Sequence, residues 1–273
     1  MSAKAALPLR ADAEVRLNRA EGGTNFRLRL AVDGWPGAEP GHFVMLSPGA
    51  RGAAQRFDPL LPRPMAVYRT LGGGASPEIE VLYKATGRGT QLLAETRVGE
   101  RVRVVGPLGV PFALPAAGRR ALLVGGGTGI ASLYELAARA AATGPVVVML
   151  GARSEIDLMG RDDFAALGVE VRIATEDGSR GHRGRVTELL EAALAEGGLD
   201  AIYACGPTPM MRRAAELAAA RGRSCQVSLE NHMACGFGVC LGCAVPRADG
   251  TIALVCRDGP VFEAAQVAWA GVP

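Results

Sequence analysis

A change of hydrophobic pattern near residue 118 constrains the fold of this chain more than any other feature. Up to about residue 112, short runs such as "FRLRLAV" and "EIEVLYKA" alternate apolar and polar residues and are closed by Gly, Pro or Asp. From residue 119 onward, apolar strands such as "RRALLVGGG" alternate with helical stretches such as "GIASLYELAARAAATG". The first pattern predicts an antiparallel barrel or sandwich, and the second predicts βαβ units with a parallel sheet.

The last segment follows neither pattern and holds four of the six cysteines. Cys235, Cys240, Cys243 and Cys256 have the spacing C-x4-C-x2-C-x12-C, which matches the plant-type [2Fe–2S] pattern. Zinc is the alternative, but structural zinc sites usually pair two close cysteine knuckles and here the fourth cysteine stands alone. The glycines between these cysteines favour the cluster, because they let backbone N–H groups approach sulfur.

These boundaries divide the chain into three predicted domains, a barrel over 1–118, an α/β domain over 119–224 and a small cysteine domain over 225–273. With 273 residues, 49% hydrophobic and 21% charged, the composition is that of a globular protein. No run approaches the ~20 apolar residues of a membrane span, and no signal-peptide core begins the chain. We therefore expect a cytoplasmic protein without membrane contact. No Lys/Arg run with interleaved aromatic residues indicates a nucleic-acid surface.

Two turns of the predicted parallel sheet indicate a phosphate-binding site. The stretch "LLVGGGTGIAS" places small residues at the first strand-to-helix turn, where backbone N–H groups can approach an anion. It is not the dinucleotide G-x-G-x-x-G fingerprint, because Ile130 occupies the sixth position. A second stretch, "YACGPTPMM", ends the last predicted strand of this domain. Since ligands bind beyond the carboxyl ends of parallel strands, both turns should face one crevice.

The order of several motifs resembles the ferredoxin-NADP reductase superfamily. They are "RPMAVYR", "LYKATGRGT", "GPLG", "GGGTGI" and "CGPTPMM", at 63–69, 82–90, 106–109, 125–130 and 205–211. The resemblance implies that FAD is bound by Arg63, Pro64, Met65, Ala66, Leu82, Tyr83, Lys84, Gly89 and Thr90. It implies that NAD is bound by Gly125, Gly126, Gly127, Thr128, Gly129, Cys205, Gly206 and Pro207. Ala66 departs from the pattern, because the family usually has a hydroxyl residue there.

The end of the chain is similar to one branch of that superfamily. "SLENHMACGFGVCLGCAVP", "CRDGPVF" and "ATEDGSRGHRGRVTELL" resemble the electron-transfer subunits of NAD-linked dihydroorotate dehydrogenase. This resemblance implies an FMN-containing catalytic partner subunit that oxidises dihydroorotate, in a heterotetramer with two copies of each subunit. Electrons would pass through the cluster and FAD of this chain to NAD, and no catalytic residue for dihydroorotate is expected here. Asn231 and His232 depart from the acidic and Arg residues common in the family, and we interpret His232 as a surface histidine or one beside the ligands.

A chemical argument connects the three cofactors. Nicotinamide exchanges two electrons as hydride, whereas an iron–sulfur cluster passes them singly, so flavin is needed as the converter. Two alternatives stay open, namely a subunit of an NADPH-ferredoxin oxidoreductase or sulfhydrogenase complex and a zinc-stabilised binding module without catalytic function. Glu155 and Asp157 favour NAD over NADP, since negative charge near the adenosine ribose repels a 2′-phosphate, although Arg153 would act in the opposite direction.

Overall fold

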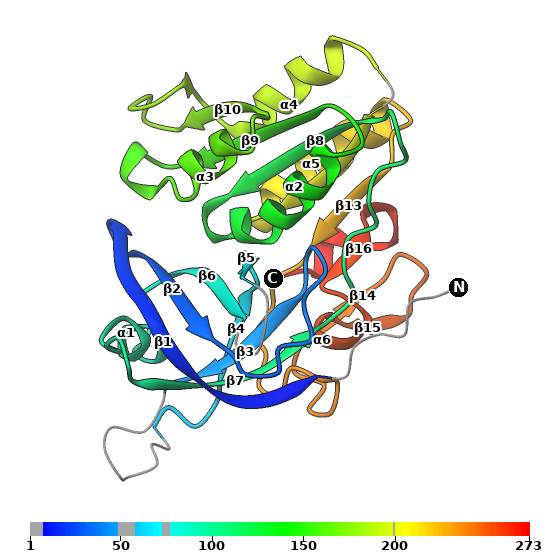
Figure 1. Ribbon diagram of the computed structural model, residues 1–273. Helices are drawn as coiled ribbons and strands as arrows, with labels where there is room; N and C mark the ends of the chain where they lie inside the picture. Colours follow the sequence, from blue (N-terminus) through cyan, green and yellow to red (C-terminus); the bar gives the residue numbers. More distant parts are fainter. Residues whose placement is uncertain (1–7, 49–57, 73–76, 199) are drawn as a thin grey trace.

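The computed structural model describes residues 8–48, 58–72, 77–198 and 200–273 (Figure 1). The N-terminal part is a seven-stranded antiparallel sheet in the order β4-β3-β7-β1-β2-β6-β5. Its strands are β1 (Leu9–Gly22), β2 (Asn25–Ala31), β3 (Phe43–Ser47), β4 (Arg63–Ala66), β5 (Arg69–Leu71), β6 (Glu78–Lys84) and β7 (Arg101–Leu108). A short helix, α1 (Arg88–Ala94), connects β6 to β7.

The antiparallel sheet curls until its two edge strands become neighbours in the chain. Only Val67 and Tyr68 separate β4 from β5, and Val67 N–H donates to the carbonyl of His42 at 2.9 Å. Tyr68 N–H donates to the carbonyl of Glu80 on β6 at 2.8 Å. The interior is filled by alternating side chains of these strands, for example Leu28 and Val81, which are fully buried. The predicted antiparallel barrel is therefore confirmed.

The middle of the chain forms a second sheet, in the order β11-β10-β9-β8-β12-β13-β16. Its strands are β8 (Arg120–Gly126), β9 (Val146–Ala152), β10 (Glu170–Thr175), β11 (His182–Arg183), β12 (Asp200–Cys205), β13 (Cys225–Ser228) and β16 (Val261–Glu263). All neighbours are parallel except β13 and β16. The helices are α2 (Tyr134–Ala141), α3 (Arg161–Ala166), α4 (Val186–Ala195) and α5 (Thr208–Ala220), with short 3₁₀ turns at η1 (Gly127–Leu133) and η2 (Glu155–Asp157). The predicted parallel α/β domain is confirmed.

Successive strand residues face opposite sides of this sheet and pack against different helices. Leu122 and Val124 join α4 and α5 in one core, whereas Leu123 joins α2 and α3 in another. The helix expected to follow the glycine turn begins as the 3₁₀ helix η1, not as an α-helix. Its backbone passes so close to β12 that a Cβ on Gly129 would lie 2.4 Å from the Cys205 carbonyl carbon.

The C-terminal segment lies beside both larger units (Figure 1). It contains the hairpin β14 (Ala244–Pro246) and β15 (Ile252–Leu254), the single-turn helix α6 (Val255–Asp258) and the 3₁₀ turns η3 (Ala264–Gln266) and η4 (Trp269–Gly271). Its strand β16 pairs with β13 and so extends the parallel sheet. Between β13 and β14, residues 229–243 form neither helix nor strand. Across the described residues, no helix has the length and apolar character needed to span a membrane.

Charged side chains join the barrel to the parallel-sheet domain. Asp163 on α3 accepts from Arg27 at 2.6 Å, from the Tyr68 hydroxyl at 2.9 Å and from Arg69 at 3.3 Å. Glu80, fully buried on β6, accepts from the same two arginines. Burial opposes ionisation of Asp163, but the hydrogen bonds from Arg27 and Tyr68 outweigh it and lower its pKa. The two domains therefore meet through a partly buried set of ion pairs.

Candidate functional site

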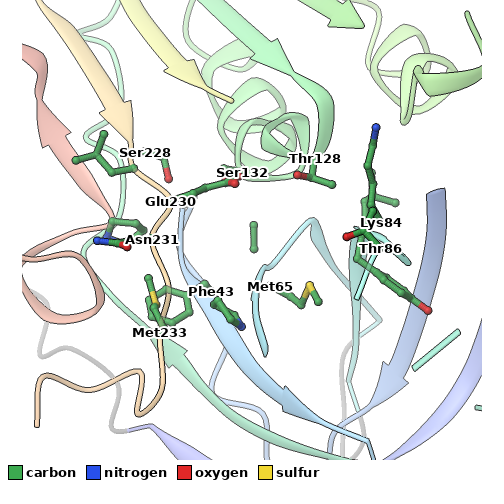
Figure 2. Close-up of a pocket in the computed structure, with 17 residues that line it drawn as sticks. Phe43, Met65, Lys84, Thr86, Thr128, Ser132, Ser228, Glu230, Asn231 and Met233 are labelled. Atoms are coloured by element: carbon green, nitrogen blue, oxygen red, sulfur yellow. The ribbon is translucent and has the colours of Figure 1, made fainter. Parts of the chain in front are cut away.

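A cavity of about 270 Å³ lies where the barrel, the parallel sheet and the C-terminal segment meet (Figure 2). Six of the nine residues predicted to bind flavin line it. They are Pro64, Met65 and Ala66 on β4 and Leu82, Tyr83 and Lys84 on β6. Thr128, from the predicted nucleotide set, lines the opposite wall together with Ser132 on the same turn. The structure thus brings part of both predicted sets to one cavity.

Arg63, Gly89 and Thr90 do not line this cavity, but they lie together at its barrel edge. A Cβ on Gly89 would lie only 2.7 Å from Nε of Arg63, so the guanidinium packs directly on the start of α1. Arg63 also donates to the carbonyl of Leu61 at 2.7 Å. The hydroxyl of Thr90 donates to the carbonyl of Gly87 at 2.9 Å. A cation beside the backbone of a helix start suits a pyrophosphate, so the chemistry of these residues fits the predicted flavin.

The two predicted nucleotide turns contact each other at the carboxyl end of the parallel sheet. Gly125 at the end of β8 is paired with Cys205 at the end of β12. A Cβ on Gly206 would lie 2.9 Å from the carbonyl oxygen of Gly126, and one on Gly126 would lie 2.9 Å from Cδ of Pro207. Gly127 has a φ of +56° and open space beside it. These glycines leave room at the strand ends for a dinucleotide, which is where open parallel sheets bind ligands.

The four clustered cysteines lie as two pairs in the described structure. Cys243 and Cys256 have their sulfurs 3.2 Å apart, and the Gly238 N–H donates to Cys256 Sγ at 3.1 Å. Burial and the neighbouring Cys243 thiol raise the pKa of Cys256 to about 12. Around Cys235 burial is outweighed by hydrogen bonds from the backbone and thiol of Cys240, which lower its pKa to about 6. Within the described ranges, no three or more His, Cys, Asp or Glu residues form a ready metal-binding group. Four thiols with inward-pointing N–H groups are nonetheless a donor set that suits iron and sulfide.

The cluster segment also packs onto the barrel next to the cavity. Gly236 lies against β3, because a Cβ there would be 2.5 Å from Cγ of Met45. Met233, two residues before Cys235, lines the cavity together with Phe43 of β3. Cys235, the first of the predicted ligands, is therefore close in sequence to a residue of the cavity wall.

Sequence reasoning missed several cavity residues on the nucleotide side. Ser228, Glu230 and Met233 all follow the last parallel strand β13 or end it. The rule that ligands bind at the carboxyl ends of parallel strands could have identified them. Figure 2 shows Glu230 and Ser228 on the wall that faces Met65 and Lys84 of the barrel. Glu230 is exposed to solvent, but the protein atoms around the cavity raise the pKa of its carboxyl.

The two acidic residues expected near the adenosine ribose have different surroundings. Asp157 forms an ion pair with Lys84 of the barrel at 3.0 Å. Glu155 is half exposed and lies 3.7 Å from both Arg161 and Arg180. Both follow β9, the strand beside the glycine turn.

The barrel, the parallel sheet and the cavity between them define a reductase of the flavin and nicotinamide type. A chain in the solved structure of an NADH-dependent reduced ferredoxin-NADP oxidoreductase has a similar fold, with a TM-score of 0.82 and 30% identity. The match covers 99% of the present chain and 92% of the other chain. The family profile "Oxidoreductase NAD-binding domain" matches residues 123–216. "Iron-sulfur cluster binding domain of dihydroorotate dehydrogenase B" matches residues 230–268.

Curated relatives define the family more narrowly. The dihydroorotate dehydrogenase B (NAD(+)) electron transfer subunit of Bacillus caldolyticus is 42% identical over 84% of this chain and 86% of its own length. That of Geobacillus thermodenitrificans is 43% identical over 84% and 86%. A probable subunit of this kind from Methanopyrus kandleri is 39% identical over 92% and 88%. The chain belongs to the family of dihydroorotate dehydrogenase B (NAD(+)) electron transfer subunits.

This result confirms the resemblance, the oxidoreductase function and the iron–sulfur and NAD cofactors expected from the sequence. An electron transfer subunit works with a catalytic partner subunit, as predicted. The assignment of individual residues to each cofactor stays a prediction, as do the three domain boundaries.

Proposed function

We propose that this chain takes electrons from an FMN-containing catalytic subunit that oxidises dihydroorotate and delivers them, through its [2Fe–2S] cluster and FAD, to NAD+. The observation that carries this proposal is the shared cavity. Its walls include barrel residues of the predicted flavin set, Thr128 of the nucleotide turn and Met233 beside the cluster segment. A hydride acceptor, a flavin and a cluster could therefore all approach one small volume, as a short electron path requires.

Each wall of the cavity has a separate task in this proposal. The barrel residues of the cavity would hold FAD, which would supply the conversion between single electrons and hydride. Arg63 neutralises the pyrophosphate, while Ala66 and Leu82 line the ring without offering a side-chain hydroxyl. The glycines at 125–129 have no side chains that would keep the nicotinamide from approaching the same cavity.

The cluster segment is the proposed docking face for the catalytic subunit. Phe237, Val239 and Leu241 have 56%, 72% and 62% of their surface exposed, although they are apolar and close together in sequence. Leu241 also has a φ of +59°, which a non-glycine residue rarely adopts. Exposed apolar side chains around a cofactor indicate a surface that another protein covers. The partner would receive this surface, and two copies of each subunit would form the heterotetramer.

The protein is proposed to work in the cytoplasm. All six cysteines are free thiols, and four of them are the predicted cluster ligands. Free thiols persist in reducing compartments, where iron–sulfur ligation does not compete with disulfide formation.

A second candidate function follows from the solved ferredoxin-NADP oxidoreductase structure, which matches 99% of this protein. In that alternative the cluster would exchange electrons with a ferredoxin in place of a dihydroorotate-oxidising subunit. The sequence "CRDGPVF" (256–262) favours the first function.

Reconstitution tests the proposal directly. The FAD- and cluster-loaded chain is mixed with the FMN-containing dihydroorotate dehydrogenase subunit from the same source, and complex formation and NADH production are measured. We expect a stable complex that reduces NAD+ with dihydroorotate, while the isolated chain reduces only artificial acceptors with NADH. Dihydroorotate-dependent NAD+ reduction by the isolated chain, or reduction only with ferredoxin, would contradict it.

A further inference from the structure

The hairpin β14–β15 brings one cation next to the two buried thiols of the cluster segment. Its strands pair antiparallel, so Cys243 before β14 and Cys256 after β15 lie together at the open end of the hairpin. The Cys256 N–H donates to Cys243 Sγ at 3.4 Å, and Arg257 is the next residue of the same single-turn helix, α6. The other Lys or Arg residue within 225–273 is Arg247, which follows β14 at the turn end of the hairpin. Arg257 is therefore the cation of this segment that lies at the ligand end.

The side chain of Arg257 packs on the loop that carries the other two predicted ligands. A Cβ on Gly238 would lie 2.9 Å from Cδ of Arg257 and 3.2 Å from its Cβ. The same glycine donates its N–H to Cys256 Sγ at 3.1 Å. Gly238 therefore contacts both the arginine side chain and a predicted ligand sulfur, and a larger residue would not leave room for this packing.

Asp258 fixes the guanidinium of Arg257 in place. Nε donates to Asp258 Oδ1 at 2.9 Å and Nη2 donates to Oδ2 at 3.1 Å, while Oδ2 also accepts the N–H of Leu254 at 2.8 Å. This two-point pair orders a side chain that is 60% exposed. The hydrogen bond and charge of Asp258, and then the charges of Cys256 and Cys243, raise the pKa of Arg257. The guanidinium and the thiols are thus close enough for their charges to interact.

A fixed charge beside a redox centre changes how readily that centre is reduced. Each electron that passes singly through the segment adds one negative charge to a small volume that four thiolates already surround. A nearby cation lowers the free energy of that reduced state, whereas a nearby anion raises it.

We propose that Arg257 stabilises the reduced form of the cluster through its positive charge, and that Asp258 limits this effect by partly neutralising the guanidinium. The inference rests on the ligation of the cluster by the four predicted cysteines, which belongs to the proposed function. The step that it affects is the transfer of one electron, without a proton and without a change of covalent bonds.

Redox titration of the full chain loaded with FAD and cluster, followed by electron paramagnetic resonance, tests the role of Arg257 without turnover. At the solution potential that reduces half of the unmodified cluster, we expect the ratio of reduced to oxidised cluster to fall by a factor on the order of five in Arg257→Gln. The ratio should rise in Asp258→Asn, which removes the neutralising charge but keeps an oxygen for the Leu254 N–H. Arg257→Lys should restore most of the ratio, and all of these changes should shrink at high salt.

Arg213→Gln is the matched control for these variants. Arg213 on α5 is also exposed and paired with a carboxylate, since it donates to Glu191 of α4 at 3.4 Å, but it belongs to the parallel-sheet domain. It should leave the ratio unchanged. An unchanged ratio in Arg257→Gln, or a change of the same direction in Arg257→Gln and Asp258→Asn, would overturn the proposal.

Iron and sulfide counts on every variant separate this proposal from the ligation on which it rests. If Arg257→Gln loses its iron, Asp258→Asn decides, and the absence of a rise in its ratio overturns the proposal. Absence of iron and sulfide from the unmodified chain would overturn both the ligation and the role of Arg257. A full cluster content with equal ratios in all variants would overturn the role of Arg257 alone.

Discussion

The barrel–sheet junction and the cluster segment are held together in different ways. At the junction, ion pairs made by the chain itself hold two domains together, with Arg27 and Glu80 almost completely buried. In the cluster segment, residues 229–243 have no regular secondary structure, and the thiols lie as two pairs. The junction is complete without a ligand, whereas the segment depends on the group that its cysteines hold. Structural metal sites are known to contribute folding energy in this way.

Removing one cysteine ligand should disrupt the cluster segment and leave the barrel–sheet junction intact. In Cys240→Ser we expect loss of the long-wavelength cluster absorption and of dihydroorotate-driven NAD+ reduction, down to background. FAD should stay bound and NADH should still reduce dyes, because the cavity walls belong to the barrel and sheet. Visible spectra with iron, sulfide and flavin counts check this result.

Cys225→Ala is the matched control for that substitution. Cys225 is buried on β13, outside the cysteine cluster, and burial raises the pKa of its thiol to about 12, so it behaves as a small apolar side chain. It should keep the full iron and sulfide content. Stoichiometric zinc without sulfide in the unmodified protein would contradict the cluster assignment.

Asp163→Asn should weaken the barrel–sheet junction while leaving the cluster segment intact. Because the side chain is partly exposed, we expect a loss of about 1–3 kcal/mol in the free energy of unfolding at neutral pH. Its pKa is lowered in the folded state, so the stabilisation is present above the ordinary value of 3.8 and is lost as the pH falls through the lower folded value. Denaturant unfolding at several pH values checks both the size and the sign.

Asp162→Asn provides the control for the junction. Asp162 precedes Asp163 on α3 but is exposed and pairs only with Arg161 within the described residues. Its replacement should leave stability nearly unchanged. An equal loss in both variants, or a difference that persists at acidic pH, would show that the junction is not held by the Asp163 ion pairs.

Local pattern makes most of this fold predictable. Strands that alternate apolar and polar residues have one buried face, so "FRLRLAV" predicts β2 and its barrel position directly. Buried runs such as "PVVVMLGA" predict β9 because parallel strands are covered on both faces. The spacing of the cysteines is likewise a local property of the chain, and it indicates the cluster without any knowledge of how the domains pack.

Contacts between distant segments are not predictable in the same way. The helix after the glycine turn begins as a 3₁₀ helix at the point where Gly129 approaches the Cys205 carbonyl on another strand. Asp157 was expected to face the nucleotide, but it also pairs with Lys84, 73 residues away. Glu230 was missed because its place on the cavity wall depends on which barrel residues lie opposite. Each case depends on long-range packing, which the order of residues does not show.

The exposed apolar residues offer a finer test of the cluster segment. In Val239→Ser we expect the dissociation constant of the complex with the catalytic subunit to rise about tenfold, because 72% of the surface of this residue is exposed and open to a partner. Cluster content should not change. Val98→Ser is the control, since Val98 is 65% exposed but lies on the barrel between α1 and β7. Similar affinity for both variants would place the docking face elsewhere.

The smallest expected effect concerns the choice between NAD and NADP. Glu155 follows β9, whose end adjoins the glycine turn through the pair Gly126 and Gly151. Its carboxylate should repel a 2′-phosphate, although Arg161 and Arg180, each 3.7 Å away, reduce its effective charge. We expect NADH to reduce the flavin faster than NADPH, and Glu155→Gln to reduce that preference by a factor on the order of five.

Stopped-flow reduction of the FAD-loaded chain by each cofactor measures this preference. Glu170→Gln is the matched control, because Glu170 is an exposed carboxylate at the opposite, amino end of β10. The effect should shrink at high salt, since a half-exposed charge is screened by ions. Asp157 contributes less in this interpretation because Lys84 already neutralises it across the junction. Faster reduction by NADPH in the unmodified protein would mean that the arginines around Glu155, and not its carboxylate, set the nucleotide preference.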